Sequence, residues 1–146
     1  MKNLLFACIG LLLTNIVFAN ANECTSFQGT YLNDETGSIQ KIVQYDCNAI
    51  TVEHENGAEY LQIDGIERII TSPINVSQNQ FLKLEWIGDS IRSTTTKYAS
   101  SQKINVESIN GFVMSPSSEG ISITPFSIDR KGIEFKGEPI EWINQN

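Results

Sequence analysis

Apolar and polar residues alternate in short runs along most of the chain, and turn-forming residues separate these runs at intervals of about ten residues. Beyond residue 21, no stretch shows the apolar period of an amphipathic helix. The pattern therefore predicts an all-β domain, in which about eight to ten strands form an antiparallel up-and-down meander. A sheet of this kind with one apolar face closes as a barrel or half-barrel, and a two-layer β-sandwich is the alternative.

The segment between Cys24 and Cys47 predicts the first hairpin. Turn-forming residues at 33–37 lie between two flanks that are rich in β-formers. Folding the segment about its centre sets Leu32 opposite Ile39 and Cys24 opposite Cys47. The two cysteines are thus equally far from the turn, as a bridge across one hairpin requires.

The strongest turn signal is the Asn-Gly pair at 56–57, which predicts a second hairpin. A two-residue turn at this pair sets Ile50 opposite Ile63 and His54 opposite Glu59. The apolar residues of both strands then share one face. The turn and the hydrophobic pattern therefore indicate the same register.

The Gly-Asp pair at 88–89 predicts a third hairpin with a strand on either side. Its register sets Trp86 opposite Ile91 on the apolar face and Glu85 opposite Arg92 on the other face. Opposite charges that fall directly across a strand pair support this register.

The rest of the chain predicts further short strands and loops. A second Asn-Gly pair, at 110–111, predicts another hairpin. Residues 73–80 are polar and predict a loop, whereas Pro125 predicts that residues 121–128 form an edge strand. The tail at 140–143 predicts either a last strand or a segment packed across one end.

The first residues have the three-part layout of a secretory signal peptide. One basic residue, Lys2, precedes an apolar run at 4–18, and a small-x-small cleavage site follows at 19–21. The run is shorter than the span of about 20 apolar residues that a membrane anchor needs. We therefore expect residues 1–21 to be removed and residues 22–146 to form a single exported all-β domain.

Cleavage removes Cys8, so the mature chain keeps two cysteines, Cys24 and Cys47. An even number of cysteines in an exported protein favours a disulfide over two free thiols or a metal pair. We therefore predict a bridge between Cys24 and Cys47 in a periplasmic or extracellular protein. The short leader and the Ile/Asn/Lys-rich composition indicate a bacterial source.

The whole chain carries ten basic and 17 acidic residues, a formal charge of −7. Loss of Lys2 with the leader leaves nine basic residues, so the mature chain has a charge of −8. Nucleic acid and anionic lipid repel an acidic protein, so we expect no nucleic-acid partner and no membrane insertion after cleavage. This charge is typical of a soluble exported protein, and it gives no information on the oligomeric state.

Arg68, His54 and Glu59 are polar residues that the register places on the apolar inner face. An unpaired guanidinium is costly to bury, so Arg68 needs a carboxylate, an exposed rim position or an anionic ligand. Glu59 is its nearest inward acid in this register. Leu84 and Trp86 make another part of the interior apolar. Apolar walls with a few convergent polar groups are typical of small-molecule sites, and a solid core with a polar rim fits the same residues.

The sequence carries no signature of a catalytic, metal or cofactor site. His54 is the only histidine, no Gly-x-Ser-x-Gly motif occurs, and both mature cysteines are expected to be oxidised. A zinc site needs three or four ligands, whereas only His54 and Glu59 have plausible geometry. Paired carboxylates of a hydrolase meet in space and leave no pattern along the chain. We therefore predict a non-enzymatic protein without a cofactor.

The first strand and turn resemble the opening of the calycins, the lipocalin and avidin group, in Gly29-Thr30-Tyr31-Leu32-Asn33-Asp34 and the following Gly37-Ser38. Lipocalins open on Gly-x-Trp, whereas avidins open on Gly-x-Trp-x-Asn with a Gly-Ser pair one position sooner than here. The resemblance implies an eight-stranded up-and-down barrel with a ligand cup. It also implies that Asn33 and Ser38 hold positions that contact biotin in avidins. Tyr31 stands where these families have Trp.

These observations predict an exported, non-enzymatic, lipocalin-like β-barrel that binds a small apolar or anionic ligand, or a protein partner. One alternative is a structural or interaction module of the envelope, with a filled core and with its function on loops or an exposed edge such as 121–128. A second alternative is a carboxylate-dependent hydrolase. An internal cavity would favour the ligand-binding barrel, and a packed interior would favour the envelope module. A cleft in which acidic side chains converge would favour the hydrolase.

Overall fold

The computed structural model describes residues 24–71 and 76–145, so the leader predicted at 1–21 lies outside the described residues. All of the regular structure in these ranges is β, as the alternation in the sequence predicts. In chain order the strands are β1 (Gly29–Asn33), β2 (Ile39–Gln44), β3 (Ala49–His54), β4 (Gly57–Gln62), β5 (Arg68–Thr71), β6 (Val76–Ile87), β7 (Ser90–Tyr98), β8 (Val106–Pro116), β9 (Gly120–Ile128), β10 (Glu134–Lys136) and β11 (Ile140–Asn144).

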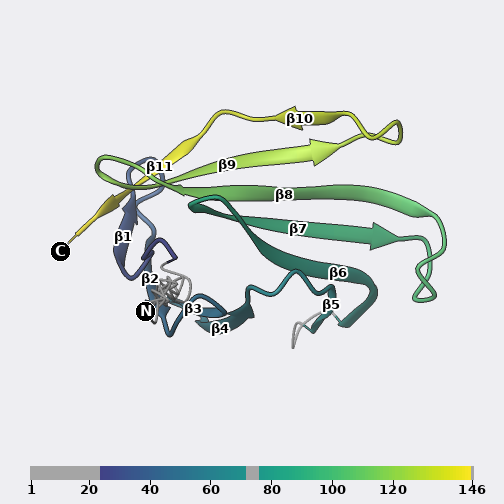
Figure 1. The fold of residues 1–146 in the computed structure, drawn as a ribbon, viewed down its shortest axis with the longest axis horizontal. Helices are drawn as coiled ribbons and strands as arrows, with labels where there is room; N and C mark the ends of the chain where they lie inside the picture. Colours follow the sequence, from purple (N-terminus) through teal and green to yellow (C-terminus); the bar gives the residue numbers. More distant parts are fainter. Residues whose placement is uncertain (1–23, 72–75, 146) are drawn as a thin grey trace, which may run out of the picture.

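The strands form one antiparallel meander sheet in the order β4-β3-β2-β1-β11-β9-β8-β7-β6-β5, with β10 paired to β9. The long strands β6 to β9 run side by side, and β11 joins them to the four short strands β1 to β4 (Figure 1). β4 and β5 follow each other in the chain, yet within the described ranges they do not pair, and they form the two edges of the sheet. The all-β meander is thus confirmed, as an open half-barrel-like sheet that is not closed into a barrel.

One face of this sheet forms the hydrophobic core. Because side chains alternate across a strand, every second residue of the short and the long strands points to the same side. These residues pack together with two residues that lie outside the strands, Phe27 and Ile63. The buried strand members of the cluster are Tyr31, Ile42, Ile50, Leu84, Ile91, Met114, Ile121 and Trp142. The inner face is therefore occupied by packed side chains.

The first hairpin has the predicted register. β1 and β2 pair with Leu32 opposite Ile39. Cys24 and Cys47 form the predicted disulfide, with their Cα atoms 5.5 Å apart. A disulfide is consistent with an oxidising, exported location. The described part of the chain has no helix that is long and apolar enough to span a membrane.

The second hairpin keeps the predicted faces but not the predicted register. The two-residue turn consists of residues 55–56, and Gly57 is already the first residue of β4. His54 therefore faces Gly57 and not Glu59. Gly57 has a φ of 140°, which glycine adopts readily, so its place is next to the turn rather than within it. Because the slip is two residues, every side chain keeps its face.

The third hairpin has the predicted register, with Glu85 opposite Arg92. The two charges nevertheless bond elsewhere, because Glu85 pairs with Lys83 at 2.7 Å and Arg92 pairs with Glu134 of β10 at 2.6 Å. The Arg92 guanidinium also lies 3.9 Å above the centre of the Phe126 ring. The register was thus predicted correctly, but neither charge pairs across it: Glu85 pairs within its own strand β6, and Arg92 pairs with a strand that is distant in sequence.

The hairpin predicted at 110–111 is wrong, because β8 runs through both residues. Gly111 lies opposite Phe126 of β9. A Cβ atom added to Gly111 would lie 1.9 Å from the Ser93 carbonyl oxygen and 3.0 Å from the Phe126 ring. Glycine is therefore needed here for close packing inside a strand, which is the other common use of a strand glycine.

The prediction that residues 121–128 form an edge strand is also wrong. β9 pairs with β8 along one side and with β11 and then β10 along the other. Pro125 lies where β11 gives way to β10, so its missing N–H removes no ladder hydrogen bond. Its carbonyl oxygen accepts the N–H of Gly137 at 2.8 Å, from the segment between β10 and β11.

Two further segments differ in extent from the sequence expectations. The loop predicted at 73–80 is partly strand, because β6 begins at Val76; residues 72–75 lie outside the described residues. The tail forms β11, which pairs with both β1 and β9. It is therefore a central strand that makes the two halves of the meander one sheet.

Candidate functional site

A groove lies on the open side of the sheet, between the edge strands β4 and β5. Its volume is about 460 Å³, and we call it the seam. The seam is lined by Ala58, Glu59, Tyr60, Leu61, Gln62, Arg68, Ile69, Ile70, Leu82 and Leu84. The structure thus brings together three of the five residues predicted for a ligand site, Arg68, Glu59 and Leu84.

The seam has an apolar floor and exposed apolar lips. Leu61 and Leu82 pack against the buried core, so they face inward. The neighbouring side chains along the two edges face outward, where Tyr60 is 61% exposed and Ile69 is 49% exposed. An occupant of the seam would therefore cover apolar surface on both sides of the sheet.

Within the part of the chain that the structure describes, the backbone of β4 is paired on one side only. Just beyond its end, the Ile63 N–H donates to the Asn48 carbonyl oxygen over 2.6 Å. In an antiparallel ladder, hydrogen-bonded pairs alternate with pairs that are not hydrogen-bonded, so this bond shows which residues of β4 bond to β3. Every second residue from Gly57 to Ile63 bonds to β3 in this alternation. The residues between them direct their N–H and C=O groups into the seam: Ala58, Tyr60 and Gln62.

Arg68 is held by Asp64, an acid of the β4–β5 connection, and not by Glu59, the nearest inward acid in the predicted register. Its guanidinium donates two hydrogen bonds to the Asp64 carboxylate, of which the Nη1–Oδ1 bond is 2.7 Å long. A further bond of 3.2 Å reaches the Ile66 carbonyl oxygen. Chiefly because of the hydrogen bonds from Arg68, the pKa of Asp64 falls from 3.8 to about 2.

Glu59 lies on the inner side of the free edge, opposite Val52 of β3. Its side chain forms none of the ion pairs found among the described residues. The polar triad predicted from the sequence is therefore not assembled, because only Glu59 and Arg68 share the seam. His54 lies at the end of β3 outside the seam, where its Nδ1 accepts the Asn56 N–H over 3.3 Å.

The charge of the protein is concentrated in the part that includes β4. Residues 24–70 hold eight acidic residues against two basic ones, a formal charge of −6. Residues 71–146 hold eight acidic residues against seven basic ones, a formal charge of −1. Both bases of the first part are engaged, because Lys41 pairs with Glu53 at 3.1 Å and Arg68 pairs with Asp64. The electrostatic potential around β4 is therefore negative.

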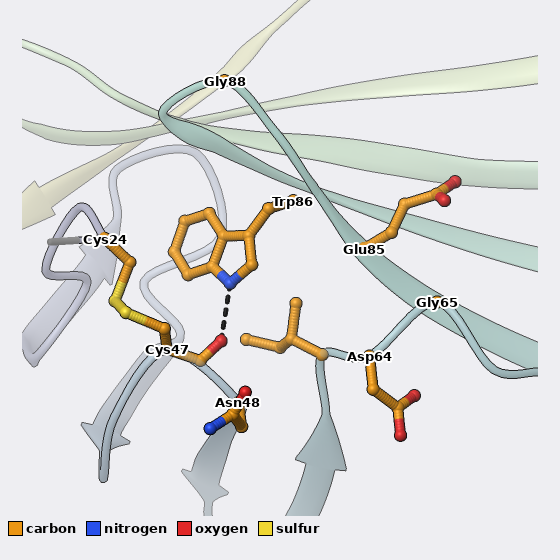
Figure 2. Close-up of a pocket in the computed structure, with 9 residues that line it drawn as sticks. Cys24, Cys47, Asn48, Asp64, Gly65, Glu85, Trp86 and Gly88 are labelled. Carbon is orange, nitrogen blue, oxygen red and sulfur yellow. Dashed lines mark hydrogen bonds between the residues drawn. A yellow bond between two sulfur atoms is a disulfide. The ribbon is translucent and has the colours of Figure 1, made fainter. Parts of the chain in front are cut away.

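A second groove, of about 590 Å³, lies beside the disulfide. Figure 2 shows the Cys24–Cys47 bridge on one side of it, Asp64 and Gly65 on the other, and Trp86 between them. Trp86 was predicted for the ligand site together with Leu84, yet it lines this groove and not the seam.

Both the indole N–H and the ring of Trp86 contact other residues of the chain. Its Nε1 donates to the Cys47 carbonyl oxygen over 2.6 Å (Figure 2). Its ring stacks on Phe27, with the ring centroids 5.9 Å apart. Trp86 therefore holds the disulfide-bonded hairpin against β6, which is a structural role.

Most of the side chains that line the seam are apolar. Among the described residues of its lining, Glu59 is the only carboxylate, whereas glycoside hydrolysis by carboxylates uses two. Asp64 lies next to the seam, but with a pKa of about 2 it is ionised near neutral pH and cannot donate a proton there. The described residues contain no group of three or more His, Cys, Asp or Glu side chains that could hold a metal.

Asn33, which the calycin resemblance places at a ligand-contacting position, is buried in this structure. Its Oδ1 accepts the backbone N–H groups of Glu35 and Thr36, both over 3.0 Å. The hydroxyl of Ser38 is exposed and accepts a 2.9 Å hydrogen bond from Thr36. Both side chains thus bond within the β1–β2 turn.

Sequence reasoning missed two features of the seam. Asp64 was not identified as the partner of Arg68, although an acid four residues before an arginine in a turn-rich connection is a local signal for it. Tyr60 and Ile69 were not among the predicted site residues, because the site was sought on the inner face of a barrel or half-barrel. These two residues line a groove because β4 and β5 remain separate edges of the sheet.

No protein-family model, curated protein or solved structure matches this chain.

Proposed function

We propose that this chain is an exported, non-enzymatic binding protein whose ligand lies in the seam between β4 and β5. The observation that carries the proposal is the edge of β4, which is unpaired among the described residues and lies beside an apolar floor. This edge has no lysine, proline or bulge, and its one protective charge is the inward-facing Glu59. The inner face is filled by its own side chains, which supports a site in the seam over a cup inside a barrel.

The seam suits an apolar ligand or a protein partner better than a free anion. Arg68 is the only cationic side chain among its described lining residues, and Asp64 already accepts two hydrogen bonds from it. An anionic ligand would have to displace Asp64 from Arg68. The alternative of an envelope interaction module also fits the packed interior. The exposed edge that such a module would use is β4, because residues 121–128 do not form an edge strand.

The test is photo-crosslinking from inside and outside the seam. p-Benzoylphenylalanine would replace Tyr60 in one variant and Phe135 in another, because Phe135 is a similarly exposed aromatic residue (55%) on β10, away from the seam. Each mature protein would be irradiated with the exported fraction of its source organism and analysed by intact mass spectrometry. We expect a discrete adduct from position 60 and none from position 135. Equal labelling at both positions, or none at position 60, would overturn the proposal.

A further inference from the structure

We infer that the occupant of the seam is an extended polypeptide segment with a cationic side chain, which adds as a strand to the free edge of β4 and sets this cation beside Glu59. The inference rests on the proposed function and names the class of partner.

The backbone of β4 presents a template for strand addition. Ala58, Tyr60 and Gln62 each direct one N–H and one C=O group into the seam. The strand contains no lysine and no proline, and its pairing with β3 continues without a bulge from Ala49 to His54. Three of the devices that natural proteins use to block an edge are therefore missing from β4.

Side chains on both faces of the seam fit the alternation of an added strand. Every second side chain of such a strand would point inward onto Leu61, Leu82 and Leu84, which are packed or partly packed in the core. The side chains between them would point outward, between the exposed rings and branches of Tyr60 and Ile69. The pattern expected in the partner is therefore apolar residues at every second position.

Charge selects the partner among possible strands. Glu59 is an inward-facing acid on the edge and has no ion-pair partner among the described residues. An inward charge disfavours pairing with a wholly apolar strand, whereas a lysine or arginine across from it forms a favourable cross-strand pair.

A second copy of this chain is disfavoured as the occupant. Pairing of β4 with another β4 would bring together two regions that each carry a formal charge of −6 over residues 24–70. Arg68 cannot compensate, because its guanidinium is already bonded to Asp64. A basic segment of another polypeptide is the occupant that the charges favour.

The probe is a blocked seven-residue peptide, Thr-Val-Thr-Lys-Thr-Val-Thr, which places valine and lysine on one face. Amide hydrogen exchange of the mature protein would be measured by NMR with and without millimolar peptide. We expect slower exchange at Ala58, Tyr60 and Gln62, and unchanged exchange at Glu59 and Leu61, whose amides already bond to β3. Unchanged exchange at the three outward amides would overturn the inference.

Two matched peptides test the backbone pairing. N-methylation of the two interior threonine amides blocks the edge that pairs with β4 in an antiparallel ladder, whereas N-methylation of the two valine amides alters the other edge. We expect the first to abolish the slowed exchange and the second to preserve it. Equal binding of both methylated peptides would mean that no strand pairing occurs.

Replacement of Glu59 tests the charge. Because Glu59 is exposed, we expect Glu59→Gln to weaken binding of the lysine peptide by about two- to fivefold, and to remove the preference for lysine over glutamate at the central position. Glu55→Gln is the control, because Glu55 is an exposed acid of the β3–β4 turn outside the seam. Equal effects of the two substitutions would overturn the role of Glu59.

The two proposals fail in distinguishable ways. A small-molecule adduct at position 60, together with no peptide-induced protection of β4, would refute strand addition and leave the seam as a ligand site. The absence of any preferential adduct at position 60 would refute the seam itself.

Discussion

The indole Nε1 of Trp86 donates a hydrogen bond to the carbonyl oxygen of Cys47 over 2.6 Å, which links β6 to the disulfide-bonded hairpin across 39 residues of sequence. Phe27 stacks on the same indole, so the bond is shielded on one face. The free edge of β4 is thus attached to a firmly held unit, because the chain passes from Cys47 through β3 directly into β4.

Trp86→Phe removes this hydrogen bond and keeps most of the ring. We expect the free energy of unfolding to fall by about 1–3 kcal/mol, because the partly buried Cys47 carbonyl loses its indole donor. Urea unfolding followed by circular dichroism measures the change. Trp142→Phe is the control, since Trp142 is buried in the same core. A loss no larger than that of the control would show that the hydrogen bond contributes little.

The Cys24–Cys47 disulfide closes a loop with a sequence separation of 23 residues. We expect Cys24→Ser together with Cys47→Ser to lower the free energy of unfolding by about 3 kcal/mol, because the unfolded chain gains loop entropy. Intact mass spectrometry before and after reduction should show the loss of two hydrogens in the mature protein, and free thiols in the native protein would contradict the bridge.

At Gly111, where a turn was predicted, strand β8 packs closely against its neighbouring strands. We expect Gly111→Ala to destabilise the fold by about 1–3 kcal/mol, because its Cβ would overlap the Ser93 carbonyl oxygen and press on the Phe126 ring. Asn110→Ala is the control, since Asn110 is the exposed neighbour in the same strand. Thermal unfolding of both variants gives the comparison, and equal stability would mean that β8 shifts to accommodate the methyl group.

Local patterns predicted the strands and two of the three main registers. The β1–β2 register followed from turn residues at 33–37 and equally spaced cysteines, which are short-range signals. The dipeptide signal failed at 110–111, because the need for glycine there arises from Ser93 and Phe126 on neighbouring strands. A single-sequence pattern does not contain such a contact.

The candidate site was predicted less well than the fold. The alternation of side chains along each strand predicted that Glu59, Arg68 and Leu84 point inward. All three line the seam. Their placement beside an open edge depends on whether β4 and β5 pair, which is decided by the curvature and length of the whole sheet. Alternation along one strand gives no information on that closure, so Tyr60 was not recognised as part of the site.

The ion pair between Asp64 and Arg68 should make the β4–β5 connection sensitive to acid. The folded protein lowers the pKa of Asp64 from 3.8 to about 2, so the pair's contribution to stability is complete above pH 3.8 and disappears as the pH falls toward 2. An NMR titration of the Asp64 carboxyl group measures this pKa directly. We expect Arg68→Met to return it toward 3.8, because the hydrogen bonds from Arg68 are the largest cause of the shift.

Stability measurements should agree with the titration. Asp64→Asn removes the ionisable group, so its difference in stability from the native sequence should shrink as the pH falls below 3.8. Because Asp64 and Arg68 are both partly exposed, high salt should weaken the pair as well. Arg68→Met should leave the protein folded, since the core beneath the seam is formed by other residues. A severe loss of stability in this variant would instead mean that the connection between the two edges holds the whole sheet in its open form.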